Sequence, residues 1–236
     1  MTPYRTLSRA SLAAALAFSF AFAGCSSNEQ SVKDAANLFF ESFNHLCEAD
    51  TLKVSGTLDL IGTQSQISAQ MISSPAQLAL SLGQPNAEPL IDFYLRDGRT
   101  YLNAMGTKTA SVAENIGISK DQKLHLPNPF LELSREERAK LFDSVKVKDD
   151  VYTFVINNRE AEKFLDYYGA AKVNKATLVT TIHDDVINTL SIDIDGTYEI
   201  DTASSDLDLK ADLVIEQVGG KMTIDFPADL DTYKTE

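Results

Sequence analysis

The stretch ATLVTTIHDDVINTLSIDI, residues 176–194, decides the fold of this chain. Apolar side chains occupy alternate positions before and after the polar pair Asp184-Asp185. Because successive side chains of a strand point to opposite faces, this alternation predicts two strands that each have one apolar face. The two aspartates supply turn residues between them. We therefore predict an antiparallel hairpin here.

The same two-residue period extends outward from this hairpin over most of the chain. It recurs in residues 53–103 and 145–226, with turn residues between the runs. Asp97-Gly98 is a strong signal for a two-residue hairpin turn, and Gly219-Gly220 leads into a last strand that Pro227 closes. Such clean alternation is typical of an antiparallel sheet with one wet face. We count about ten strands.

The first of three predicted helices begins near Ser31, which can cap it. Its apolar residues recur at helical spacing and include the aromatic stripe Phe39-Phe40-Phe43. The stripe fits core packing, and it also fits the lining of a lipid cavity. Cys47 lies in this apolar stripe, which favours a small buried core residue over a reactive thiol. It is the only cysteine besides Cys25, so the domain has no internal disulfide.

Two shorter helices are predicted in the middle of the chain. Ser134 and Glu137 form a capping box that starts a helix extending to about Asp143. Asn157 or Asn158 caps the next helix, which has an apolar face on one side.

Residues 106–133 break the strand rhythm, apart from a short helix that we expect near residues 112–116. Apolar side chains are spread along this section: Val112, Ile116, Leu124, Leu126 and Phe130. The section is too irregular for a strand and too apolar for a simple solvent loop. Long segments of this kind are often functional, so we expect it to plug a core or to border a cavity.

These elements predict an α+β fold with a wide, curved antiparallel sheet, a half-barrel of about ten strands. About three helices cover its concave face, since a sheet this wide curls with its twist. Such a shape tends to leave an apolar cavity. The candidate residues for a ligand cavity are drawn from the aromatic helix and the middle section: Phe39, Phe43, Val112, Ile116, Leu124, Leu126 and Phe130.

The N-terminus has the pattern of an export signal. Arg5 and Arg9 precede an apolar run, residues 12–23, that is too short to span a bilayer comfortably. The run ends in Phe22-Ala23-Gly24-Cys25, followed by polar residues. This motif resembles the lipobox of bacterial lipoproteins, which usually has Leu where this chain has Phe22. The resemblance implies that Cys25 receives a diacylglyceryl group and that cleavage occurs before it.

The predicted organisation is therefore a lipoprotein signal peptide at residues 1–24, a lipidated tether at residues 25–30 and a single α+β domain at residues 31–236. Removal of the signal removes two arginines and no acids, so the net charge falls from −13 to −15. Because a surface with this negative charge repels the phosphate backbone of DNA or RNA, we exclude nucleic acid as a partner. It also indicates that lipid, rather than a basic patch, holds the protein at a membrane.

We find no motif that indicates catalysis, a metal or a cofactor. His45, His125 and His183 lack metal-ligand spacing, and the Gly-x-Ser-x-Gly signature of serine hydrolases is absent. Asp193-x-Asp195-Gly196 lacks the remaining ligands of a calcium loop. We predict that the protein is not an enzyme.

The order of lipobox, helix, strand meander, mid-chain helices and closing strands is similar to the LolA-like lipoprotein-carrier fold. In layout it most resembles the actinobacterial lipoproteins that include LppX and LprG. The Tyr94-to-Tyr101 hairpin and the terminal Ile224-Asp225-Phe226-Pro227 take part in this resemblance. The resemblance implies binding of acyl chains, of lipids or lipidated proteins, without chemistry.

We therefore expect a lipoprotein anchored through Cys25 to the outer face of the cell membrane, or to an envelope membrane in a Gram-negative host. Its extracytoplasmic body would carry or sense a lipid or acyl chain in an apolar cavity. The alternative is a docking module for another protein, with a filled core; an enzyme with an unrecognised site is a third hypothesis. A continuous apolar void between sheet and helices would favour the carrier.

Overall fold

The computed structural model describes residues 29–119, 121–165, 170–200 and 203–235. The predicted signal peptide and Cys25 lie outside these ranges, as do the predicted lipidation and cleavage. In the part of the chain that is described, no helix is both long and apolar enough to cross a membrane.

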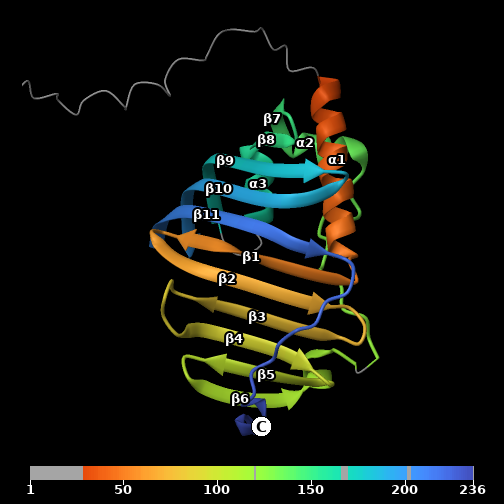
Figure 1. The fold of residues 1–236 in the computed structure, drawn as a ribbon. Coiled ribbons are helices and arrows are strands. Elements are labelled where there is room, and N and C mark those ends of the chain that lie inside the picture. Colours follow the sequence, from red (N-terminus) through yellow and green to blue (C-terminus); the bar gives the residue numbers. More distant parts are fainter. Residues whose placement is uncertain (1–28, 120, 166–169, 201–202, 236) are drawn as a thin grey trace, which may run out of the picture.

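One sheet of 12 strands dominates the described structure, in the order β12-β6-β5-β4-β3-β2-β1-β11-β10-β9-β8-β7 (Figure 1). Neighbouring strands are antiparallel, except that β12 is parallel to β6. The first seven strands along the chain are β1 (Thr51–Leu60), β2 (Thr63–Ile72), β3 (Gln77–Gly83), β4 (Pro89–Arg96), β5 (Arg99–Ala104), β6 (Thr107–Val112) and β7 (Phe142–Lys148). The others are β8 (Val151–Ile156), β9 (Ala170–His183), β10 (Val186–Ile200), β11 (Ala203–Val218) and β12 (Lys234–Thr235).

The hairpin predicted from residues 176–194 is confirmed as β9 and β10. Leu178 pairs with Ile192 and Ala176 with Ile194, so the apolar side chains share one face. Asp184 and Asp185 form the turn with positive φ angles of 49° and 60°. Aspartate tolerates this left-handed region better than most residues, which suits it to the turn.

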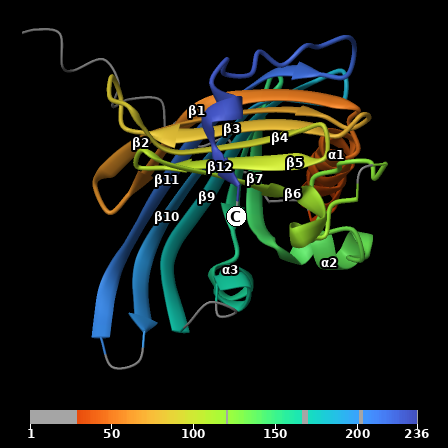
Figure 2. The same ribbon diagram turned by 90° about the horizontal axis from the view of Figure 1, so that it is seen from below.

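The sheet bends strongly, and three helices lie on its concave side (Figure 2). They are α1 (Glu29–Cys47), α2 (Arg135–Lys140) and α3 (Asn158–Leu165). The predicted fold class, a curved and unclosed antiparallel sheet covered by helices, is confirmed. The second helix is shorter than predicted, because Leu141 already leaves it and Phe142 begins β7.

The main core lies between α1 and the concave face of the sheet. Phe39 and Phe40 of α1 are 5% and 3% exposed, and Phe154 of β8 is fully buried among them. Cys47 is buried at the end of α1, and burial raises the pKa of its thiol. Its predicted place in the core is confirmed.

The C-terminal segment, residues 219–235, differs from the sequence prediction. Residues 221–228 contain no strand, although Met222, Ile224 and Phe226 alternate as a strand would. The segment instead crosses over the sheet on the side away from the helices and ends beside β6 (Figures 1 and 2). A segment that crosses the strands cannot join their hydrogen-bond ladder, so alternation alone misled the prediction.

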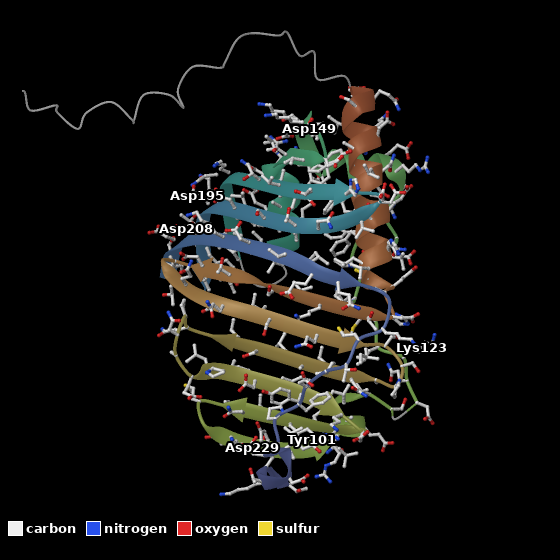
Figure 3. The ribbon with its side chains drawn as sticks, viewed as in Figure 1. Tyr101, Lys123, Asp149, Asp195, Asp208 and Asp229 are labelled. Carbon is white, nitrogen blue, oxygen red and sulfur yellow. The ribbon has the colours of Figure 1, made fainter. Side chains whose placement is uncertain are left out.

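Aromatic side chains attach this segment to the convex face. Phe226, Leu230 and Tyr233 pack against Tyr94, Tyr101 and Ala110. The Tyr94 and Phe226 rings are 6.2 Å apart, and burial, followed by the charge of Asp92, raises the pKa of Tyr94 to about 12. Lys108 of β6 forms an ion pair with Asp229, which lies near Tyr101 in Figure 3.

The middle section contains one strand that the sequence analysis did not predict. Thr107–Val112 forms β6, because its backbone pairs fully with β5 even though its alternate side chains are mostly polar. The expected short helix follows at Ala113–Ile116 as a 3₁₀ turn.

Candidate hydrophobic-ligand site

An apolar pocket of about 340 Å³ lies between the helices and the concave face of the sheet. Its helical walls come from Phe39, Phe40 and Phe43 of α1 and Ala161 and Leu165 of α3. The strands contribute Phe142, Ile156, Leu178, Leu190, Ile192 and Ile194, and Phe130 and Leu141 complete it with Glu160. Pockets that bind small ligands generally start near this size, at about 300 Å³.

The wall formed by α1 is a cluster of aromatic rings in contact. Phe40 and Phe130 have ring centroids 5.1 Å apart, and Phe43 and Phe130 are 5.8 Å apart. Phe39 stacks on Phe43 at 6.0 Å and meets Phe154 behind it at 5.8 Å. Such edge-to-face and offset contacts hold the rings in place, so the wall is preformed.

The sheet side of the pocket comes from the same hairpin that decides the fold. Leu190, Ile192 and Ile194 follow one another at two-residue spacing along β10, and Leu178 lies beside Ile192 on β9. Alternation therefore has two effects: it places these side chains inside the curve of the sheet, and it leaves the intervening Ser191 and Asp193 on the other face.

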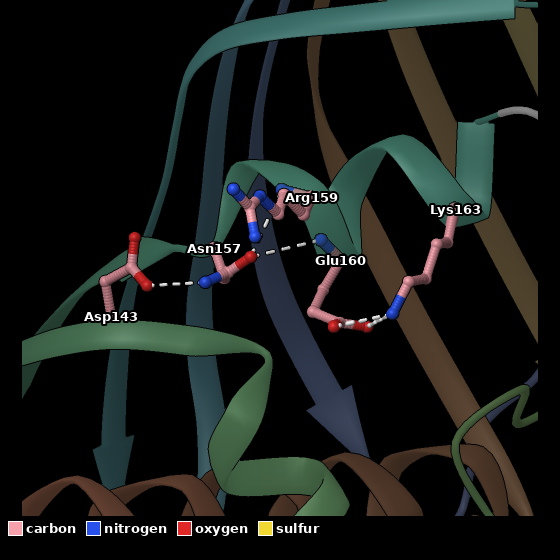
Figure 4. A network of polar contacts seen from close by, with 5 residues as sticks. All are labelled: Asp143, Asn157, Arg159, Glu160 and Lys163. Atoms are coloured by element: carbon pink, nitrogen blue, oxygen red, sulfur yellow. Dashed lines mark hydrogen bonds and ion pairs between the residues drawn. The ribbon is translucent and has the colours of Figure 1, made fainter.

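The lining contains one charged residue, Glu160 of α3, and its carboxylate is already satisfied. The Lys163 Nζ donates to both carboxylate oxygens at 2.7 and 2.8 Å (Figure 4). The rest of the lining that the structure describes is hydrocarbon and aromatic ring, with no second charged side chain among those residues. The pocket therefore offers an occupant mainly apolar contact.

Asn157 positions α3 beside the pocket. Its Oδ1 accepts hydrogen bonds from the backbone N–H of Arg159 and Glu160 at 3.1 and 3.2 Å, and its Nδ2 donates to Asp143 at 2.6 Å (Figure 4). Of the two predicted caps, Asn157 is therefore the one that caps the helix. Together with the ion pair of Lys163, it fixes the first turn of α3, which carries Glu160 and Ala161.

A shallow depression of about 390 Å³ lies between α2 and α3 and adjoins the pocket. It shares Leu141 and Glu160 with the pocket, and its other lining residues are Leu133, Glu137, Lys140 and Lys163. The lining is thus mainly charged in the depression and mainly apolar in the pocket. We take the gap between α2 and α3 as the opening of the site.

The structure brings together three of the seven residues that the sequence suggested for a cavity. Phe39, Phe43 and Phe130 line the pocket. Leu124 and Leu126 pack against the main core outside it, and the Leu126 N–H donates to the Cys47 carbonyl at 3.2 Å. They close the core at the end of α1.

Val112 and Ile116 lie away from the pocket and are 47% and 55% exposed. Val112 pairs with Arg99 at the β5–β6 edge of the sheet, far along the strand order from β9 and β10. Residues of the lining that the sequence analysis did not propose include Phe142, Leu178 and Ile192. Their apolar alternation showed that they face the concave side, but not which strands α1 covers.

Among the described residues, no three His, Cys, Asp or Glu side chains gather as a metal-ligand set. His183 lies at the β9–β10 turn, where Nδ1 is 3.0 Å from Asp150 and Nε2 is 3.4 Å from Asp184. The hydrogen bond with Asp150, followed by the charge of Asp184, raises the pKa of His183.

Comparison with known proteins identifies no family for this chain. No protein-family model matches it, and no curated protein matches it. Among solved structures it is similar to the Mycobacterium tuberculosis lipoprotein LppX, with 11% sequence identity and a TM-score of 0.45. The match covers 81% of this chain and 98% of LppX. A similarity this low cannot transfer a ligand or an activity, so a functional assignment depends on the pocket itself.

Proposed function

We propose that this protein is a membrane-anchored extracytoplasmic lipoprotein that binds a lipid or acyl chain in the pocket, as a carrier or sensor without catalysis. The observation that carries the proposal is the pocket of about 340 Å³, whose lining is apolar except for the ion-paired Glu160. The predicted lipobox at Cys25 supplies the anchor.

The composition of the lining favours a hydrocarbon occupant. Each methylene that is buried contributes about 0.8 kcal/mol, and an acyl chain can occupy this apolar space without breaking protein hydrogen bonds. Cavities lined by Leu, Ile and Phe stay dry or bind apolar molecules. A polar ligand would lose hydrogen bonds to water and gain few in return.

The covalent lipid on Cys25 would hold the protein beside its ligand source. One acyl chain anchors only marginally, whereas two or more anchor stably. The strongly acidic composition gives no alternative electrostatic means of attachment to an anionic membrane.

The rival function, a docking module, predicts an interior filled by side chains. The preformed aromatic wall beside an unfilled apolar space favours the carrier over this alternative. The chemistry of the lining also favours it over an enzyme, because Glu160 is the one titratable group among the lining residues that the structure describes, and it is engaged by Lys163.

Filling the pocket tests the proposal. Ile192→Trp places a bulky side chain in the pocket on a strand that tolerates aromatic residues. We expect the affinity for a fluorescent fatty acid, measured by titration on a chain of residues 26–236, to fall by at least about tenfold, or 1.4 kcal/mol.

The matched control is Val214→Trp, on the outer surface of the neighbouring strand β11, where Val214 is 49% exposed. This variant should retain the affinity of the unmodified chain. Equal affinity for both variants would show that the fatty acid binds elsewhere, and the pocket would lose its assigned role.

A further inference from the structure

The proposed anchor lies at a defined end of the molecule. The described chain begins at Glu29, four residues after Cys25, and an extended chain spans at most about 3.6 Å per residue. The first turn of α1 is therefore held within roughly 14 Å of any lipid on Cys25. Because α1 has 19 residues and a helix rises 1.5 Å per residue, its other end is about 28 Å further along its axis.

The elements beside this first turn are α2 and β7 (Figure 1). Glu29, Val32 and Lys33 of α1 line one shallow surface together with Glu136, Ala139 and Lys140 of α2 and Phe142 and Asp143 of β7. Lys140 also lines the depression between α2 and α3 that adjoins the pocket. The anchored end of the molecule and the opening of the pocket are therefore neighbours.

The charge distribution agrees with a membrane on this side. Residues 134–165, which form α2, β7, β8 and α3, contain seven basic and seven acidic residues, so they are neutral in a chain of net charge −13. Residues 193–216 contain eight acids and one lysine. Asp195 of β10 and Asp208 of β11, within that acidic stretch, lie on the side of the sheet away from α1 (Figure 3). An anionic membrane surface therefore repels residues 193–216 but does not repel the neutral stretch of residues 134–165.

Side chains suited to lipid headgroups are exposed at the anchored end. Lys140 forms no ion pair with any residue that the structure describes, and Arg159 at the start of α3 is exposed. Leu131, just before α2, is 54% exposed, and its carbonyl accepts a hydrogen bond from Arg138 at 3.5 Å. Cations beside an exposed leucine are typical of surfaces that contact a bilayer interface.

We propose that the first turn of α1, α2 and the gap between α2 and α3 lie against an anionic bilayer, so that ligand passes directly between the bilayer and the pocket. This inference depends on the proposed function, both for the lipid on Cys25 and for the ligand in the pocket. The far edge of the sheet, at β5 and β6, then projects away from the membrane.

The orientation can be measured without any ligand. Lys140→Cys and Met105→Cys place a thiol-reactive fluorophore at the two ends, since Met105 is 81% exposed in the β5–β6 turn and Cys47 is buried. The two labelled positions lie near opposite edges of the sheet, because Met105 precedes β6 and Lys140 lies shortly before β7. In the strand order, β6 and β7 are ten steps apart, each of about 4.8 Å along the curved sheet. The lipidated protein is bound to phosphatidylcholine vesicles containing roughly one-third phosphatidylglycerol and lipids spin-labelled at the headgroup.

We expect quenching at position 140 to exceed quenching at position 105 several-fold. Equal quenching, or stronger quenching at position 105, overturns the orientation even if the pocket binds fatty acid in solution. Protein that washes off the vesicles refutes the anchor, and with it both the orientation and the membrane part of the proposed function.

A second measurement tests the path of the ligand. Lys140→Glu with Arg159→Glu should slow the uptake of a fluorescent fatty acid from these vesicles several-fold, because the reversed charges repel the anionic surface. The control pair, Lys123→Glu with Lys221→Glu, changes the net charge equally at exposed positions elsewhere and should leave the rate unchanged. Equal slowing by both pairs overturns the proposed contact surface.

Discussion

At the residue scale, this protein depends on small polar groups that fix the turns between its strands. Asp97, Asp149, Asp184 and Asp185 all have positive φ angles, between 49° and 60°. Aspartate accepts this conformation more readily than β-branched or bulky residues do, which suits it to these turn positions.

One of these turns also contains the clearest pH-dependent contact. Asp150 and Asp184 both approach His183, and they raise its pKa above the ordinary value for histidine, mainly through the hydrogen bond with Asp150. Because the folded state binds the proton more tightly, this contribution to stability is fully present below the unfolded pKa. It is lost as the pH rises through the raised pKa of the folded state.

Asp150→Asn should therefore lower the pKa of His183 towards its ordinary value, as measured by NMR titration of the imidazole protons. The control is Asp185→Asn in the β9–β10 turn, next to Asp184. This substitution should shift the pKa of His183 much less. A pKa of His183 that is unchanged by Asp150→Asn would show that the hydrogen bond with Asp150 is absent in solution.

At the element scale, the sheet uses its two faces differently. The concave face carries the apolar alternation and receives the three helices (Figure 2). The convex face of β4–β6 carries Tyr94, Tyr101 and Lys108, and residues 219–235 cover it. The C-terminal segment therefore stabilises the part of the sheet that the helices do not reach.

A chain that ends at Gly220 should lose protection against hydrogen exchange first in strands β4 to β6. Without Phe226, Leu230 and Tyr233, the aromatic side chains of β4 and β5 become exposed, and β6 loses its contact with β12. Hydrogen exchange measured by mass spectrometry should be faster in residues 89–112, while β9 and β10 remain protected. Exchange that rises equally in all strands would contradict separate roles for the two faces.

A strand can be predicted from the sequence when its own side-chain pattern determines it. It cannot be predicted when contacts with distant segments determine it. The β9–β10 hairpin was predictable because its apolar alternation and its Asp-Asp turn agree. Strand β6 was not, since Thr107, Thr109 and Ser111 present polar groups where a core-facing strand has apolar ones. Its position is determined by pairing with β5 and by the C-terminal segment, which lies about 120 residues away.

The pocket shows the same limit. Phe39, Phe43 and Phe130 were predictable as apolar residues on elements that had to cover the sheet. Leu178 and Ile192 were predictable as concave residues, but their contact with α1 depends on which strands the helix crosses. That choice depends on packing across more than 100 residues of chain, which no local pattern records.

At the scale of the whole molecule, a wide sheet with few helices leaves apolar surface that the protein does not fill. Three helices of 19, 6 and 8 residues face a 12-stranded sheet among the described residues, and the pocket of about 340 Å³ is lined by α1, α3 and the sheet. A close-packed core would remove this space at a gain in stability. The proposed lipid or acyl chain would occupy this space.

Native mass spectrometry of residues 26–236, secreted without the lipid-accepting cysteine, tests this account most directly. We predict one lipid or fatty acid bound per chain, either co-purified or taken up on incubation, and its absence from the Ile192→Trp variant. A chain that keeps its bare polypeptide mass in the presence of excess fatty acid and phospholipid would contradict the account.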